Sequence, residues 1–204
     1  MSDLPSGNHY GVRILSLNGG GARGMFTMSV LSEIERILAS KHPNQDIKIG
    51  DYFDLITGTS IGGILVSALL PGKSARELER VFFDRANDIF PKRWSLTNLL
   101  RESLCAPIYR SHPLRETIQE MIGAETTFND LTRRVMIPAV NLSTGKPQFF
   151  KTPHNPDFTR DGPLKLIDAA LATSAAPTYF SPHSVRISAH ILPMVVWSQT
   201  TPAT

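Results

Sequence analysis

The pentapeptide Gly58-Thr59-Ser60-Ile61-Gly62 constrains the fold of this chain more than any other feature. It follows an apolar, strand-like stretch at residues 52–56 and precedes an apolar, helix-like stretch at residues 61–70. In a nucleophile elbow, a strand turns into a helix so tightly that side chains flanking the serine would collide, and the two glycines remove that collision. A glycine-rich turn that merely contains a serine is the simpler alternative. The strand-before, helix-after context favours an elbow, with Ser60 as the catalytic nucleophile and these neighbours around it: Gly58, Thr59, Ile61 and Gly62.

A second glycine-rich stretch, residues 18–24, follows a predicted first strand at residues 12–17. A tight strand-to-helix turn is the plainest interpretation. The spacing also satisfies the G-x-G-x-x-G pattern of dinucleotide sites, but Asp46, the acid at about the right distance, does not end a predicted strand. A third interpretation is an oxyanion hole, because consecutive glycines let backbone N–H groups converge on a developing negative charge. The serine elbow one unit later favours the oxyanion hole, built from these residues: Gly19, Gly20, Gly21, Ala22, Arg23 and Gly24.

The remaining segments alternate between helical and extended patterns. The helix after the glycine loop is predicted to bury its apolar positions and to expose its charged ones. The positions predicted to be buried are Val30, Leu31, Ile34, Ile37 and Leu38. Those predicted to be exposed are Glu33, Glu35 and Arg36. Further predicted elements are a strand at 51–57, helices at 61–70 and from a capping box at Ser74 and Glu77 to residue 90, a helix from His112 to Gly123, strands at 134–140 and 148–150, and a helix at 164–174. This alternation predicts an α/β layered fold with a mainly parallel central sheet.

Composition narrows the class of protein. A chain of 204 residues forms one domain able to bury roughly 70% of its unfolded surface. The net charge of +3 is small and its basic residues are scattered, so no nucleic-acid partner is expected. The polar N-terminus lacks a signal-peptide core, and the longest apolar run is about half a membrane span. We expect a cytoplasmic protein with Cys105 buried and unpaired, and with neither a metal nor a cofactor.

Two segments are expected to lie outside the regular fold. Residues 1–11 are predicted to be a flexible tail. Residues 92–110 are irregular, with apolar side chains spread among polar ones, and such an insertion could line an acyl pocket or form a lid. An ordinary packed loop with a short helix is the simpler interpretation of this insertion.

With both glycine motifs in place, and with the stretch Ala172-Thr173-Ser174-Ala175-Ala176-Pro177-Thr178-Tyr179-Phe180, the chain resembles the patatin-like phospholipases over residues 12–180. The resemblance implies a three-layer patatin-like fold and a serine–aspartate dyad. Ser60 would attack an ester carbonyl of a phospholipid or another acyl ester, and N–H groups around Gly20, Gly21 and Ala22 would hold the oxyanion. It also implies transient contact with a membrane surface and leaves an oligomer open. Among bacterial members, the chain looks most similar to effectors of nucleotide-activated antiphage defence.

The dyad aspartate of this family lies in an Asp-Gly-Gly or Asp-Gly-Ala motif soon after the Ser-Ala-Ala-Pro stretch, and here the sequence departs. Residues 181–204 contain no acidic residue, and the last carboxylate is Asp168, predicted to be a solvated helix residue. Back-translated one base earlier, residues 190–202 allow codons for Tyr-Phe-Ala-Asp-Gly-Gly-Leu-Val-Ala-Asn-Asn-Pro. We therefore hypothesise that residues 181–204 are a frameshifted tail foreign to the fold, and that the chain is inactive or very weak because the general-base aspartate is absent.

Two other functions compete with this one. A serine hydrolase with a histidine base would need an acid and then a histidine after the serine, and the chain offers Asp157 or Asp168 followed by His183 or His190. None of these residues lies in a convincing loop after a strand. A nucleotide-binding module that uses the glycine loop, without hydrolase activity, is the non-enzymatic alternative.

Overall fold

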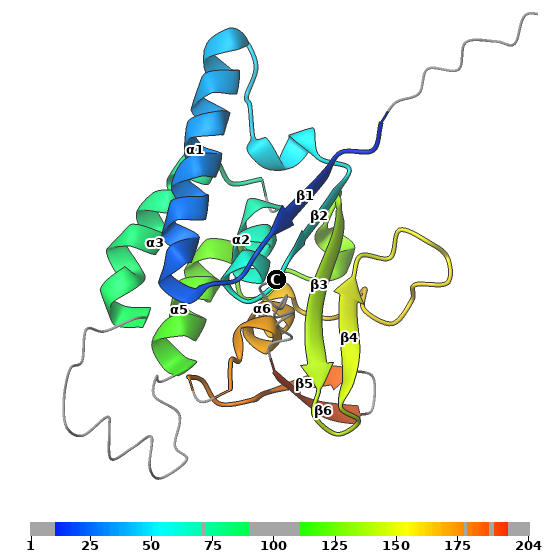
Figure 1. The fold of residues 1–204 in the computed structure, drawn as a ribbon. Coiled ribbons are helices and arrows are strands. Elements are labelled where there is room, and N and C mark those ends of the chain that lie inside the picture. The colour runs from blue at the N-terminus through cyan, green and yellow to red at the C-terminus, as the bar shows by residue number, and fades with distance from the viewer. Residues whose placement is uncertain (1–10, 71, 90–110, 178, 188–189, 196–204) are drawn as a thin grey trace, which may run out of the picture.

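The computed structural model describes residues 11–70, 72–89, 111–177, 179–187 and 190–195. A six-stranded sheet and its helices make up this part of the chain (Figure 1). The strands are β1 (Ile14–Leu17), β2 (Leu55–Gly58), β3 (Arg134–Asn141), β4 (Lys146–Lys151), β5 (His183–Ile187) and β6 (His190–Val195). The helices are α1 (Gly24–Lys41), α2 (Ile61–Leu69), α3 (Ala75–Ile89), α5 (Ser111–Ile122) and α6 (Leu166–Ser174), with 3-10 turns η1 (Gly21–Arg23), η2 (Ile49–Tyr52) and η3 (Phe128–Asp130).

The strands that carry the two glycine motifs are parallel neighbours. β1 pairs with β2 so that Leu17 lies opposite Gly58, and β2 pairs in parallel with β3. β3 also pairs antiparallel with β4 and, at Val140 and Asn141, with β6. Because the carboxyl ends of β1 and β2 coincide, the glycine loop and the serine turn leave the sheet side by side.

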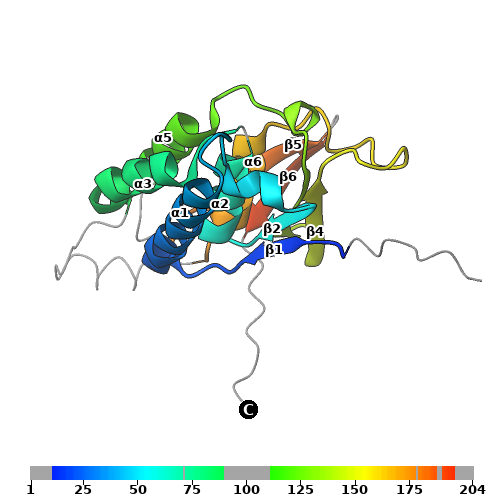
Figure 2. The ribbon, with the colours of Figure 1, turned by 90° about the horizontal axis from the view of Figure 1, so that it is seen from above.

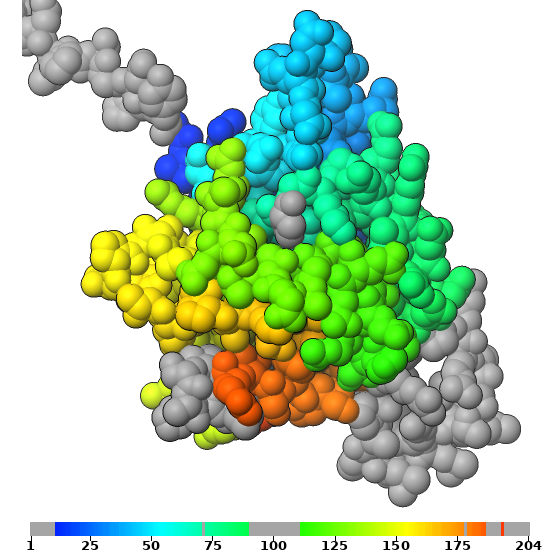
Figure 3. All heavy atoms as spheres, turned by 180° about the vertical axis from the view of Figure 1, so that it is seen from behind, coloured from blue at the N-terminus to red at the C-terminus, as the bar shows by residue number. Residues whose placement is uncertain are grey.

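Helices α2 and α6 pack directly on the sheet, and α1, α3 and α5 pack on them from outside (Figures 1 and 2). Seen from behind, α3 and α5 form much of the surface (Figure 3). The contact between α2, α6 and the sheet is tight, since a Cβ added to Gly63 would lie against Thr173 and 3.4 Å from Ile137. The α/β fold class is therefore as predicted. None of the described helices is both long and apolar enough to cross a membrane.

The predicted burial of α1 is wrong in part. Leu31 is buried as expected, but Val30, Ile34 and Ile37 are each 40% exposed, whereas Glu35 is only 5% exposed. The Glu35 carboxylate accepts hydrogen bonds from the backbone N–H groups of Ile49, at 2.9 Å, and Ala75, at 3.0 Å. Glu35 is turned inward because these two chain segments need an acceptor, which helical periodicity alone does not reveal.

Some predicted boundaries shift for local reasons. The first strand begins at Ile14, and the second begins at Leu55 because residues 49–52 form η2 instead of strand. The capping box is confirmed: Ser74 N–H donates to the Glu77 carboxylate at 3.0 Å, and Glu77 N–H donates to the Ser74 hydroxyl at 3.2 Å. The prediction of a solvated Asp168 is wrong, because its side chain is 26% exposed and lies 3.0 Å from His183 Nε2.

Several expectations fall outside the described residues: the tail at 1–10, the insertion at 92–110 with Cys105, and residues 196–204. Within the segment after residue 180, β5 and β6 form an antiparallel hairpin. Leu142 N–H also donates to the Pro193 carbonyl at 3.0 Å. Residues 183–187 and 190–195 of this segment continue the sheet.

Candidate active site

Ser60 occupies a strained turn between β2 and α2. Its backbone angles, φ 56° and ψ −126°, make it the only non-glycine residue with positive φ in the described part of the chain. Side chains at the flanking glycines would not fit, because a Cβ on Gly58 would overlap the Gly62 carbonyl and one on Gly62 would overlap the carbonyl of Leu17. This strained strand-to-helix turn, held by its surroundings, has the geometry that the predicted nucleophile elbow requires.

A hydrogen-bond relay from the far end of α6 holds this turn. The backbone N–H of Ser60 donates to Thr173 Oγ1 at 3.1 Å, and that hydroxyl donates to the Pro138 carbonyl at 2.7 Å. Thr173 is fully buried, so both bonds are shielded from water. Sequence reasoning quoted Thr173 only as part of a family-like stretch, and its contact with the elbow spans more than a hundred residues.

The glycine loop lies directly against the serine. A Cβ added to Gly19 would come within 3.0 Å of the Ser60 Cβ. Gly20 and Gly21 have φ of 147° and 56°, which suit glycine best. Within the described residues, the N–H groups of Gly20, Gly21 and Ala22 donate no hydrogen bond. Unpaired donors beside a serine are what an oxyanion hole requires.

The first turns of α1 and α2 meet at the same place. A Cβ on Gly24 would overlap the side chain of Ile61, so these helix starts are in close contact. Ser60 is the N-cap of α2 and is half-buried, and it lies next to the positive end of the helix dipole. The arrangement can stabilise negative charge on an oxygen that develops next to Ser60.

No base contacts the serine hydroxyl in the described part of the chain: neither a carboxylate nor an imidazole hydrogen-bonds to it. Asp168 and His183, two residues of the competing histidine scheme, pair with one another at 3.0 Å. Asp168 lies on α6 more than one helical turn before Thr173, the residue that reaches the elbow. Asp157 is exposed on the loop after β4, where its N–H donates to Asn155.

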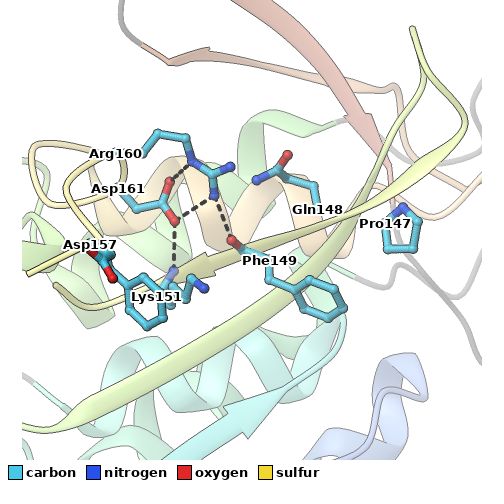
Figure 4. Close-up of a pocket in the computed structure, with 8 residues that line it drawn as sticks. Pro147, Gln148, Phe149, Lys151, Asp157, Arg160 and Asp161 are labelled. Carbon is cyan, nitrogen blue, oxygen red and sulfur yellow. Dashed lines mark hydrogen bonds and ion pairs between the residues drawn. The ribbon is translucent and has the colours of Figure 1, made fainter. Parts of the chain in front are cut away.

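A hollow of about 320 Å³ lies elsewhere, between β4 and the loop at 157–161 (Figure 4). There Arg160 binds the buried Asp161 carboxylate at 2.6 Å and the Phe149 carbonyl at 2.9 Å. Asp161 also accepts a hydrogen bond from the backbone N–H of Lys151 at 3.1 Å. The hydrogen bond between Arg160 and the Asp161 carboxylate raises the pKa of Arg160. These bonds fasten the loop to β4. Of the candidate residues, Asp157 of the histidine scheme lines this hollow, whereas Ser60 and the glycine loop do not.

Comparison with known proteins gives consistent matches. The family model described as patatin-like phospholipase matches residues 15–191. Proteins named cGAMP-activated phospholipase are similar: one from Escherichia coli is 81% identical over 183 residues, which are 90% of this chain and 51% of that protein. One from Vibrio cholerae is 66% identical over 177 residues, 84% of this chain and 50% of that protein. The chain thus spans about half the length of these curated relatives.

Among solved structures, the crystal structure of VipD from Legionella pneumophila superposes with a TM-score of 0.52 and 11% identity, covering 95% of this chain and 48% of that one. At this identity, the likeness concerns the fold alone. The family model spans most of the chain and includes both glycine motifs, which the structure brings into contact. The chain therefore belongs to the patatin-like phospholipase family.

Proposed function

We propose that this chain carries the nucleophile half of a serine lipid acyl hydrolase, with Ser60 attacking the ester carbonyl of a phospholipid. The observation that supports this proposal best is the contact between the strained Ser60 and the glycine loop. As the serine oxygen adds to the carbonyl, the carbonyl oxygen becomes an anion, and N–H groups of Gly20, Gly21 and Ala22 stabilise it. Because phospholipids reside in bilayers, we infer that this reaction takes place at a membrane surface.

The same proposal makes this chain a very weak enzyme. Serine is a poor nucleophile at neutral pH unless a base takes its proton. No described group hydrogen-bonds to the Ser60 hydroxyl, and residues 181–204 contain no carboxylate. By analogy with loss of a catalytic triad member, we expect a rate lower by a factor on the order of 10⁴ to 10⁶.

A chimera tests both parts of this proposal. Residues 1–180 of this chain are joined to the remaining C-terminal part of the Escherichia coli relative, and fatty-acid release from phospholipid vesicles is measured. Because that relative is named a cGAMP-activated phospholipase, release is measured with and without cGAMP. The native chain and the Ser60→Ala variant of each protein serve as controls, and circular dichroism shows which of them are folded.

We expect the chimera to release fatty acid and the native chain to release almost none. The chimeric Ser60→Ala variant should release none. Release by the native chain that disappears with Ser60→Ala would show that a base is present and would refute the proposed weakness. A folded chimera that releases no fatty acid, or one that keeps releasing it without the serine, would refute the role of Ser60.

We also propose that the segment after about residue 180 arose by a frameshift, and that an intact version serves in nucleotide-activated antiphage defence. The segment's lack of any carboxylate supports the first part, and the names of the relatives support the second. The coding DNA provides the test: the frame shifted by one base should read Asp-Gly-Gly near residue 194. Any other translation in that frame would remove the frameshift hypothesis.

A further inference from the structure

An exposed apolar stripe runs along α1 from the end that touches the serine turn. Phe26, Val30, Ile34 and Ile37 recur every three or four residues and therefore share one helix face. Phe26 is 75% exposed and the other three are 40% exposed. The stripe extends over about 16 Å at 1.5 Å per residue. In Figure 1, α1 stands at the side of the molecule and projects beyond the neighbouring strands.

Basic residues lie at both ends of the stripe. Arg23 precedes Phe26 by three residues and Lys41 follows Ile37 by four, so both lie on the same helix face, and both are exposed. In the described ranges, neither has an acidic partner within 4 Å. The nearest acid along this face, Glu33, is neutralised by two bonds from Arg36, at 2.6 and 2.7 Å. The face thus combines apolar side chains with uncompensated positive charge.

The basic residues at both ends decide between two surfaces that could cover the stripe, a second copy of the chain and a lipid bilayer. If two copies paired about a two-fold axis through the stripe, Arg23 would meet either Lys41 or Arg23 of the second copy, and like charges would repel. A bilayer with anionic lipids has the opposite charge and an apolar interior. Helices with one apolar face and basic residues bind such a surface lying flat in the headgroup region.

The position of the stripe next to the serine turn also favours a bilayer. Phe26 is two residues beyond Gly24, which packs against Ile61 next to Ser60. A bilayer on this face would therefore touch the end of α1 that adjoins the glycine loop. We propose that the α1 stripe is a docking surface for anionic phospholipid bilayers, which delivers lipid to the Ser60 site. The delivery role rests on the proposed hydrolase function, whereas the binding itself does not.

The test measures binding to vesicles that cannot be hydrolysed. Vesicles of ether-linked phosphatidylcholine, with or without ether-linked phosphatidylglycerol, contain no acyl ester, so failure of the hydrolase proposal leaves this measurement unaffected. Co-sedimentation compares the native chain with the double variant Val30→Gln/Ile34→Gln, in which glutamine keeps a high helix propensity. Leu142→Gln is the control, since Leu142 is 46% exposed in the turn between β3 and β4, away from the stripe. Lys41→Gln tests the charge.

We expect binding to phosphatidylglycerol vesicles that weakens with added salt, an at least ten-fold loss in the double variant, a smaller loss in Lys41→Gln and none in Leu142→Gln. Circular dichroism and thermal melting confirm that each variant is folded. Absence of binding by the native chain, or equal binding by the double variant, would overturn the proposal. So would a native dimer in light scattering that the double variant converts to a monomer, because the stripe would then join two copies.

Discussion

Replacing Glu35 with alanine is expected to destabilise the fold far more than the same change at an exposed charged residue of α1. One buried carboxylate oxygen accepts two backbone N–H groups, one from the start of η2 at Ile49 and one from the start of α3 at Ala75. Alanine removes this acceptor and leaves two buried donors without partners. Since an N–H group at the start of η2 and one at the start of α3 both bond to this side chain, both helix starts lose a hydrogen bond in one substitution.

The magnitude follows from the number and type of bonds lost. A hydrogen bond to a charged group contributes about 1.5–3 kcal/mol, so the two bonds together amount to about 3–6 kcal/mol. A typical domain is stable by only about 5–15 kcal/mol. Glu35→Gln keeps an acceptor oxygen without the charge and, because charge-assisted bonds are roughly twice as strong as neutral ones, should lose about half of that amount.

Urea denaturation followed by circular dichroism measures these differences in the free energy of unfolding. The matched control is Glu33→Ala, on the same helix, where the exposed pair with Arg36 contributes little because solvent screens it. The expected order of destabilisation is Glu35→Ala, then Glu35→Gln, then Glu33→Ala. If Glu35→Ala proves too unstable to fold, Glu35→Gln against Glu33→Ala still provides the comparison. Equal stability of the Glu35 and Glu33 variants would refute the capping role.

Three further predictions concern single residues. Gly62→Ala should cost about 1–3 kcal/mol or prevent folding, because its Cβ would overlap the backbone at the end of β1. Gly11→Ala, with nothing within 4 Å, should leave the Tm unchanged, and a native Tm for both would contradict the geometry. Thr173→Val should cost about 1–3 kcal/mol in urea denaturation by leaving the N–H of Ser60 unpaired, whereas Thr173→Ser should retain most of the stability; equal losses would contradict the relay. Hydrogen bonds from the backbone N–H and the hydroxyl of Thr127 lower the pKa of Asp130. The stabilising effect of the Asp130 carboxylate is therefore present above its unfolded pKa of about 4 and is lost as pH falls through the folded value. The Tm advantage of the native chain over Asp130→Asn should therefore be larger at neutral pH than in strong acid, and a pH-independent difference would contradict this.

Sequence reasoning succeeded where the signal was local. The spacing of glycines around Ser60 predicted a strand, a sharp turn and a helix, because the steric requirement involves only adjacent residues. The Ser74 capping box was predictable for the same reason. The alternation of strands and helices was enough for the fold class.

Sequence reasoning failed where the burial or contacts of a residue depend on a partner that is distant in the sequence. Glu35 is buried because N–H groups from two other segments need an acceptor, and nothing in the pattern of α1 indicates them. Once Glu35 turns inward, Val30 and Ile34, which lie on another side of the helix, turn outward. Thr173 reaches the elbow, and Asp168 reaches His183, only because the chain folds α6 and β5 together. Long-range pairing of single polar groups leaves no periodic trace in a sequence.

The backbone of Ser60 has a consequence for the history of the chain. A non-glycine residue held at positive φ costs on the order of 1–3 kcal/mol, and glycine would occupy the same turn without that penalty. A lineage that had long ceased to use the hydroxyl would gain stability from a single Ser-to-Gly change. The serine is still present at this position. The strain at Ser60 is thus a stability cost that a use of its hydroxyl, as in the proposed function, would offset.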